Sequence, residues 1–593
     1  MIVQFLGALR RYFALLVVLA VFGWSAFTIA IRRVEEDPPD TITLRFGHWQ
    51  LESGVRDGIN ALAAEYQQVW RKQWEGGGKN SEGRPWRQLY PDKPKVRIIQ
   101  DAIPETTYGQ WVSTQLMGGT APDIMEIWLG LPYPIWLSYL NRYFIPLTPY
   151  VHRPNPHNAG TELGPVPLGK TYKDGMRGAY VEELQAYMTI PVSQFAVRIF
   201  YNKDLLKKLT GLDKAPGDYR GFLGVCEKIG SQKNALGKAY TPIAASAYHF
   251  NMWESMLFDV VTYGALRRID FNRDTYGGND EIYTGFRSGR LSFNFPPYRA
   301  KFRMVREVTQ HFQNGYTGLN RDDAVFLFAQ QRAVFITTGT WDARSLQEQA
   351  KGKFAVGVMD FPLPSTSDPD YGPFIEGPIY ERPGSSACFG ITRTCKYQDV
   401  AVDFLLFLAS KRGNEKLNEY FGWIPAIVNT KKDPILEGFE PHLVGVYGVM
   451  NLNLGGETYI KWMQVYSKYK VDRNYSFEAM ARDFEPFYKE RGQRDFEELQ
   501  KDWRRGLQNT EQFLVGIRSR AMTAEGDQAR TEWIKYRALT ASRQVWPEIT
   551  HARQMNLVGI GPAPDAVGPY EYSPAVLEKI RTRLSRERGK SQP

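Results

Sequence analysis

Cysteine and histidine are both scarce in this chain, which holds three cysteines and seven histidines among 593 residues. So few cysteines cannot form a disulfide scaffold, and the positions of Cys226, Cys388 and Cys395 match no zinc-ligand spacing. An oxidising compartment would permit a bridge between Cys388 and Cys395, and the state of that pair is left open.

Sequence motifs of hydrolases are also missing. The chain contains no His-Glu-x-x-His motif and no Gly-x-Ser-x-Gly motif. Adjacent carboxylates such as Glu182 and Glu183 are more typical of exposed helix charge than of acid–base catalysis. We therefore expect no catalytic residue, no metal ligand set and no cofactor.

Two segments match ligand-binding motifs imperfectly. Gly164–Thr171 has the spacing of a phosphate-binding P-loop, but Pro165 and Pro167 lack the N–H groups that cradle phosphate. Polar residues within 270–281 follow the spacing of a calcium loop, yet Thr275 stands where that loop needs glycine for its turn. We interpret the first match as accidental and the second as a solvated loop, with calcium binding left open.

The composition is that of a folded protein with more than one core. It is 43% hydrophobic, 14% aromatic and 23% charged. Because domains typically hold roughly 100 to 200 residues, we expect two or more lobes. The formal net charge of +10 comes from lysine and arginine mixed with acidic residues, without a nucleic-acid-binding motif. We interpret this charge as solvated surface and expect no nucleic acid partner.

The N-terminus carries an uncharged apolar run, Tyr12–Ile31, between pairs of arginines. A run of about 20 residues can cross a bilayer as a helix. The best match to a signal-peptidase exit, Thr28-Ile29-Ala30, is poor, which favours an uncleaved signal anchor over a cleaved signal peptide. Since arginines flank both ends, charge alone does not fix the orientation.

Strand and helix patterns alternate along the first part of the chain. Residues 41–49 alternate apolar and polar side chains, 55–70 have helical spacing, and 95–99 form a second strand pattern. This alternation predicts a mainly parallel sheet covered by helices. Residues 477–546 are charged and amphipathic, which predicts a helical extension.

Tryptophans recur at the ends of predicted elements, and a tryptophan face can stack on a sugar ring while carboxylates and amides bind its hydroxyls. Trp49 and Trp341 are the best placed, because each directly follows a strand pattern and adjoins polar residues. The other members of this group are Trp128, Trp253 and Trp423.

Seven short segments occur in a characteristic order: Gly119–Ile124, Pro191–Leu206, Gly211–Phe222, Arg332–Trp341, Phe354–Pro364, Cys388–Leu408 and Gly422–Ala426. In this order they resemble the extracellular solute-binding proteins of family 1, the sugar-binding subunits of ABC importers. The resemblance covers about residues 41–480. The chain departs from the family in lacking a lipid-attachment cysteine, in extra length near Trp74, Pro154 and Tyr276, and in its C-terminal extension.

The resemblance implies a periplasmic-binding-protein-like α/β fold, in which two lobes close by hinge motion around a ligand in the cleft between them. It places residues 38–155 and 352–412 in the first lobe, and 156–351 and 413–480 in the second. Residues 1–37 then form the anchor and linker, and 481–593 the C-terminal extension. The residues expected in the cleft are Trp49, Glu52, Glu126, Trp128, Ser193, Gln194, Trp341, Glu376 and Trp423.

The function that follows is capture of a carbohydrate at the periplasmic or extracellular face of the membrane and its delivery to an ABC importer permease, without catalysis. Residues 12–31 would anchor the protein in the cytoplasmic membrane. Two alternatives remain: a sensor or scaffold of the same fold that does not serve transport, and a carbohydrate-active enzyme. Turnover of a glycan would support the enzyme.

Overall fold

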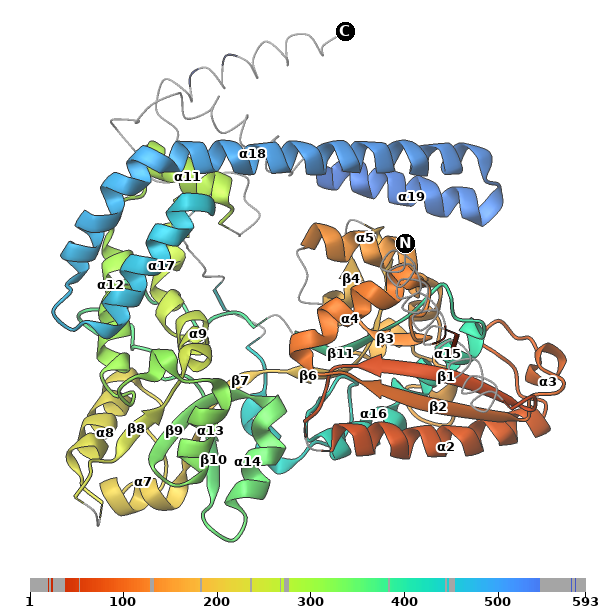
Figure 1. Ribbon diagram of the computed structural model, residues 1–593, viewed down its shortest axis with the longest axis horizontal. Helices are drawn as coiled ribbons and strands as arrows, with labels where there is room; N and C mark the ends of the chain where they lie inside the picture. Colours follow the sequence, from red (N-terminus) through yellow and green to blue (C-terminus); the bar gives the residue numbers. More distant parts are fainter. Residues whose placement is uncertain are drawn as a thin grey trace, which may run out of the picture.

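The computed structural model describes residues 38–543 apart from residues 53, 128–132, 182–183, 235–236, 267, 271–276, 382–383, 443–444 and 447–453, together with residues 20, 23, 24, 578 and 582. The fold is mixed α/β and is built on two separate sheets (Figure 1). Each sheet has its own hydrophobic core, and helices cover both.

The first lobe is built on a six-stranded sheet with the order β12-β6-β11-β3-β1-β2. Its strands are β1 (Thr41–His48), β2 (Lys95–Ala102), β3 (Ile124–Glu126), β6 (Ile190–Phe195), β11 (Gly384–Ile391) and β12 (Ile424–Pro425). The apolar side chains that alternate along β1, those of Ile42, Leu44 and Phe46, are fully buried. They pack in one core with helices α2 (Val55–Glu75), α15 (Gln398–Leu408) and α16 (Lys411–Phe421).

Shorter elements complete this lobe. They are α3 (Trp86–Leu89), α4 (Glu105–Gly118), α5 (Tyr133–Tyr143), α6 (Thr148–Val151) and the hairpin of β4 (Tyr180–Val181) with β5 (Ala186–Tyr187). The loop rich in proline and glycine before β4 is tied down by His157, whose Nε2 lies 3.0 Å from Oδ1 of Asp403 in α15. Tyr66 of α2 donates to the other oxygen of Asp403 at 2.8 Å, so one buried carboxylate joins three segments.

The second lobe is built on a four-stranded sheet with the order β10-β7-β9-β8. Its strands are β7 (Val197–Asn202), β8 (Thr241–Ala244), β9 (Ala333–Gly339) and β10 (Val356–Met359). The helices of this lobe are α7 (Lys203–Thr210), α8 (Tyr219–Ser231), α9 (Ala247–Met256), α10 (Tyr263–Leu266), α11 (Asn279–Arg287), α12 (Pro296–Thr309), α13 (Arg321–Ala329) and α14 (Ala343–Ala350). Asn202 starts α7 by accepting a hydrogen bond from the backbone N–H of Leu205, as N-cap residues do.

Crossing segments join the two lobes. A single residue, Ala196, separates β6 of one sheet from β7 of the other. Arg198, on β7 and only 1% exposed, binds Glu381 at 2.5 Å on the segment between β10 and β11. The same guanidinium donates to the carbonyls of Gly438 and Glu440, which follow β12. One buried arginine therefore fastens three crossing segments together.

The C-terminal helices are α17 (Gly456–Val471), α18 (Phe477–Thr523) and α19 (Gly526–Ser542). The first part of α18, through Phe484, Tyr488 and Phe496, is buried in the core of the second lobe. Its last part packs against α19 in a small separate core around Leu514, Ile517 and Leu539. In the view of Figure 1, α18 extends from the helices of the second lobe toward the side of the first lobe.

Strand pairing differs from the sequence prediction in two respects. Both sheets are mixed, because β11 runs antiparallel to β3 and β6, and β7 runs antiparallel to β9 and β10. The prediction of a mainly parallel sheet was therefore wrong. In addition, β10 pairs with β7 and β12 pairs with β6, although residues 352–412 were expected in the first lobe and 413–480 in the second. The two lobe assignments were wrong for one reason. The chain crosses between the lobes after β10, and it leaves the first sheet only after β12.

The C-terminal boundary also differs, since residue 481 lies inside the continuous helix α18 and its neighbours belong to the core of the second lobe. Within the described residues no helix is long and apolar enough to cross a membrane. The expected anchor, residues 12–31, lies almost wholly outside them, as do residues 271–276 of the calcium-like loop. Cys388 and Cys395 are free thiols, and Leu168–Thr171 form a short 3-10 turn instead of a phosphate-binding loop.

Candidate functional site

The first lobe brings polar and aromatic side chains together where β1 and β3 end. Gln50 follows β1 and donates from Nε2 to Oε1 of Glu126, the last residue of β3, at 2.6 Å. Trp49 packs its ring edge-on against Tyr108 of α4, 5.1 Å between centroids, and the Tyr108 hydroxyl donates to the Glu126 backbone carbonyl at 2.8 Å. Adjacent parallel strands thus deliver their terminal residues to one edge of the sheet.

Two carboxyl groups of the first lobe are shielded from water. Glu126 is fully buried, and burial raises the pKa of its carboxyl to about 8, with the negative charges of Glu52 and Glu105 adding to the effect. Burial also raises the pKa of Glu52, and Asp342 and Glu105 raise it further while Arg321 opposes the rise. Within the described residues, Oε2 of Glu52 and Oε2 of Glu126 have no hydrogen-bond partner.

The second lobe supplies an arginine and its carboxylate. Arg321 opens α13 and binds both oxygens of Asp342, the last residue of a short 3-10 turn (Thr340–Asp342) that follows β9. Asp342 also accepts a hydrogen bond from the hydroxyl of Thr338. The guanidinium lies 5.9 Å from the ring centre of Tyr248, near the start of α9.

His249 lies next to Tyr248 and is fully buried. Its Nδ1 is 2.8 Å from the hydroxyl of Ser246, whereas its Nε2 has no partner among the residues described. Burial lowers the pKa of His249 to about 4, and the positive charge of Arg321 contributes. The imidazole is therefore neutral at physiological pH and can donate or accept a hydrogen bond.

These two halves face each other across the lobes. Glu52, from the first lobe, interacts electrostatically with Arg321 and Asp342 of the second. Tyr248 of the second lobe is influenced by Glu52 and Glu105 of the first, while burial raises the pKa of its hydroxyl to about 12. Their mutual electrostatic influence places the groups in one cluster between the lobes, which we call the interlobe site.

Trp341 connects the interlobe site to the crossing segments. It is half-buried, packs against the core of the first lobe, and lies 5.9 Å from Phe195 at the end of β6. Its indole Nε1 is buried and has no hydrogen-bond partner in the described part of the chain.

The structure brings together three of the residues expected in the cleft, Trp49, Glu52 and Glu126. Trp341 directly precedes Asp342, whose charge acts on Glu52. The others lie elsewhere or outside the described residues. Ser193 and Gln194 are buried in β6, where Ser193 donates to the carbonyl of Ser386. Trp423 is buried against Phe421, Glu376 is exposed on the segment between β10 and β11, and Trp128 is not described.

Sequence reasoning missed Tyr248, His249 and Arg321 as site residues. A signal existed for the first two, because Ser246 follows the strand β8 and opens α9, the same strand-to-helix junction that identified Trp49. Arg321 follows Asn320, which caps α13 by accepting from the backbone N–H of Asp323. A capped helix start, by itself, does not indicate which lobe it faces.

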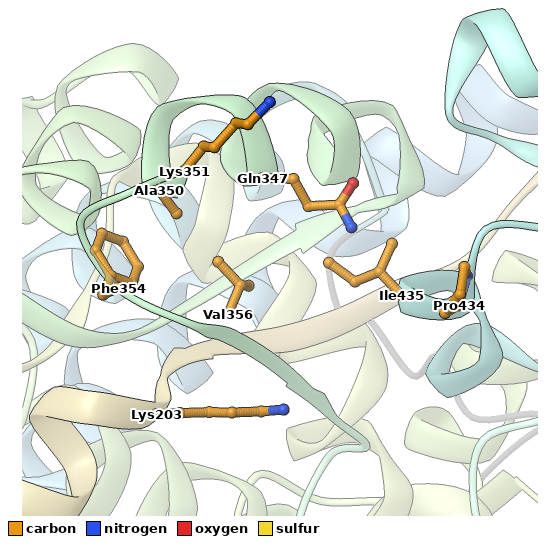
Figure 2. Close-up of a pocket in the computed structure, with 8 residues that line it drawn as sticks. All are labelled: Lys203, Gln347, Ala350, Lys351, Phe354, Val356, Pro434 and Ile435. Atoms are coloured by element: carbon orange, nitrogen blue, oxygen red, sulfur yellow. The ribbon is translucent and has the colours of Figure 1, made fainter.

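A separate groove of about 510 Å³ lies on the second lobe, between α14, β10 and the turn Pro434–Phe439 (Figure 2). None of the expected site residues lines it. Its lining residues are Lys203, Gln347, Ala350, Lys351, Phe354, Val356, Pro434 and Ile435.

Two α/β lobes that share crossing segments, with polar and aromatic side chains of both lobes near one another, are typical of bilobal binding proteins. The chain belongs to the family of bacterial extracellular solute-binding proteins, whose family model matches residues 92–436, more than half of its 593 residues. Membership implies a location outside the cytoplasm.

Similar proteins include the multiple sugar-binding protein of Streptococcus mutans, 21% identical over 349 residues that span 58% of this chain and 71% of that protein. Among solved structures, the apo-form of RafE from Streptococcus pneumoniae is 16% identical and covers 76% of this chain and 98% of its own, with a TM-score of 0.49. The sugar-binding protein MalE of Xanthomonas citri is 15% identical and covers 76% and 96%, with a TM-score of 0.45.

Proposed function

We propose that the protein captures a carbohydrate outside the cytoplasm, without catalysis, and delivers it to an ABC importer. The relative from Streptococcus mutans is named as a sugar-binding protein. The observation that carries the proposal is the composition of the interlobe site, which pairs tryptophan rings with buried polar atoms that have no partner among the described residues.

These partnerless atoms explain why a sugar would bind. Leaving a buried polar group without a hydrogen bond costs about 1–3 kcal/mol. Glu52 Oε2, Glu126 Oε2 and Trp341 Nε1 are in this state. A hydroxyl-rich ligand can donate to the Glu52 carboxylate, exchange a hydrogen bond with the Glu126 carboxyl and accept from the indole, while its apolar ring face packs on Trp341.

Closure would move the two lobes about the crossing segments that Arg198 fastens. In this proposal the first lobe is the six-stranded sheet with its helices, and the second is the four-stranded sheet with α17 and the first part of α18. Residues 12–31 would hold the protein at the membrane, which their apolar length supports.

Ligand screening of the full chain tests the proposal, in a detergent without a sugar headgroup. Mono- and oligosaccharides are compared with amino acids and peptides by thermal shift and then by calorimetry. A sugar at 100 times its dissociation constant should stabilise the protein by about 2.7 kcal/mol. If no sugar shifts the melting temperature while an amino acid or a peptide does, the carbohydrate assignment is wrong.

Substitution of Trp341 tests the location of the site. We expect Trp341→Ala to abolish sugar binding and to leave a folded protein, because the side chain is only half-buried. Trp533→Ala, which truncates an exposed tryptophan of α19, is the matched control and should bind normally. Unchanged affinity in Trp341→Ala would place the ligand elsewhere, and an unfolded product would make Trp341 a core residue.

A further inference from the structure

Acidic groups outnumber the basic group that faces them in the interlobe site. Glu52 lies within electrostatic reach of Glu105 and Asp342, and Glu126 within reach of Glu52 and Glu105. Among the described residues of this cluster the cation is Arg321, and it is already bound by both oxygens of Asp342. The positive charge is therefore balanced locally, and Glu52 and Glu105 leave the site negative. The carboxyl of Glu126, with its pKa raised to about 8, adds little charge at pH 7.

The next arginine along the lobe interface does not change this balance. Arg344 of α14 binds Glu348 at 3.0 Å and donates to the backbone carbonyls of Glu419 and Tyr420 at the end of α16. Its charge is thus engaged at the contact between α14 and α16. An anionic ligand entering beside Glu52 would have to take Arg321 from Asp342.

The atoms that have no partner fit a ligand that donates hydrogen bonds. Oε2 of Glu52 is an acceptor without a donor among the described residues. Oε2 of Glu126 also has no partner there, and its carboxyl, with a pKa raised to about 8, is mostly protonated at pH 7. His249 is fully buried in the second lobe and has no partner for Nε2 among the described residues, so the unmet polar contacts are not confined to the acidic side chains. Hydroxyl and ammonium groups can donate to Glu52, whereas a carboxylate brings only further acceptors.

We propose that the interlobe site selects its sugar by charge, with Glu52 as the determinant: it binds uncharged and amino sugars, gains affinity from an ammonium group, and excludes sugars that carry a carboxylate. This selection rests on the proposed carbohydrate function. A ligand carboxylate about 4 Å from the Glu52 carboxylate in a partly buried site is repelled enough to weaken binding at least about tenfold. An ammonium group at the same place gains a similar factor.

The test uses the full chain and oligosaccharide probes in sets that share one backbone and differ in charge: the uncharged sugar, its amino form and its uronic acid form. Affinities are measured by calorimetry at pH 7. We expect at least one uncharged sugar to bind, its amino form to bind at least as tightly, and its uronic acid form to bind at least about tenfold more weakly. Uronic acids that bind as tightly as their uncharged partners would overturn the selection and leave the carbohydrate function standing. Failure of every sugar would overturn the function itself.

Glu52→Gln then tests the determinant, since it keeps the shape of the side chain and removes its charge. We expect it to lower the affinity for the amino sugar and to raise that for the uronic acid, each about tenfold, with a smaller change for the uncharged sugar. Glu75→Gln, which removes an exposed charge at the end of α2, is the control and should change none of these ratios. An unchanged ratio of amino to uronic acid affinity in a folded Glu52→Gln protein would refute the role of Glu52.

Discussion

Replacing Glu126 by glutamine should change how the stability of the protein depends on pH. The Glu126 side chain is fully buried at the end of β3, and one of its oxygens accepts from Gln50 at 2.6 Å. Glutamine keeps that acceptor and the shape of the side chain, and it resembles the protonated acid. The substitution therefore removes the titration of this group with little other change.

The magnitude follows from the pKa in the two states. Burial raises the pKa of Glu126 to about 8 in the folded protein, against about 4.3 in an unfolded chain. The folded state then binds a proton that the unfolded state has lost. Stability from this group is full below about pH 4.3 and is lost as pH rises through about 8, which amounts to about 3–4 kcal/mol between pH 5 and pH 8.

Urea unfolding of the ligand-free protein at pH 5, 6, 7 and 8 measures the effect. The free energy of unfolding of Glu126→Gln minus that of the wild type should grow steadily with pH. Glu75→Gln serves as control, because it removes a carboxylate that is more than half exposed. A difference between Glu126→Gln and wild type that changes by less than about 1 kcal/mol over this range, which denaturant extrapolation barely resolves, would refute the reasoning.

Two further substitutions, each with a control, test the buried arginine at the crossing segments and the packing of the start of α2 against α16. Arg198→Met leaves Glu381 buried without its cation and should lower the free energy of unfolding by about 3–5 kcal/mol. The control Arg71→Met breaks an exposed ion pair on α2 and should lower it by only about 0.3–0.5 kcal/mol. Similar urea midpoints for the two variants would show that the crossing segments hold without Arg198. Gly54→Ala and Gly77→Ala both force alanine to positive φ. The new Cβ at position 54 would lie 2.1 Å from the backbone oxygen of Tyr420, whereas a Cβ at position 77 would have no atom within 4 Å. Gly77→Ala should lower the free energy of unfolding, measured by thermal melting, by about 1–2 kcal/mol, and Gly54→Ala should lower it clearly more. An equal loss of stability in the two variants would mean that the end of α16 moves aside.

Much of the fold was predictable where the pattern is local. The alternation of Ile42, Leu44 and Phe46 predicted β1, and all three are buried as it required. The short strands β10 and β12 were assigned to the wrong lobes, because four and two residues carry too little pattern to choose a sheet. Their partners lie more than 150 residues away along the chain, so pairing is set by the crossings between lobes.

The interlobe site was predictable in part for the same reason. Trp49 and Trp341 follow strands directly, and a strand end points to the edge where ligands bind in α/β folds. Trp423 also ends an element, but Phe421 and the surrounding core bury it, which no local pattern indicates. Arg321 acquires its place only because the turn after β9 folds back and brings Asp342 to it.

The long helix α18 projects beyond the second lobe as an arm. Its first part is fixed in the second lobe as far as Trp503, and twenty residues remain before it ends at Thr523, a length of about 30 Å at 1.5 Å per residue. Because the first part of α18 packs in the second lobe, any rotation of that lobe about the crossing segments carries this arm with it, together with α19, which packs on its far end. A movement between the lobes is thus also a movement of α19, which lies outside both sheets.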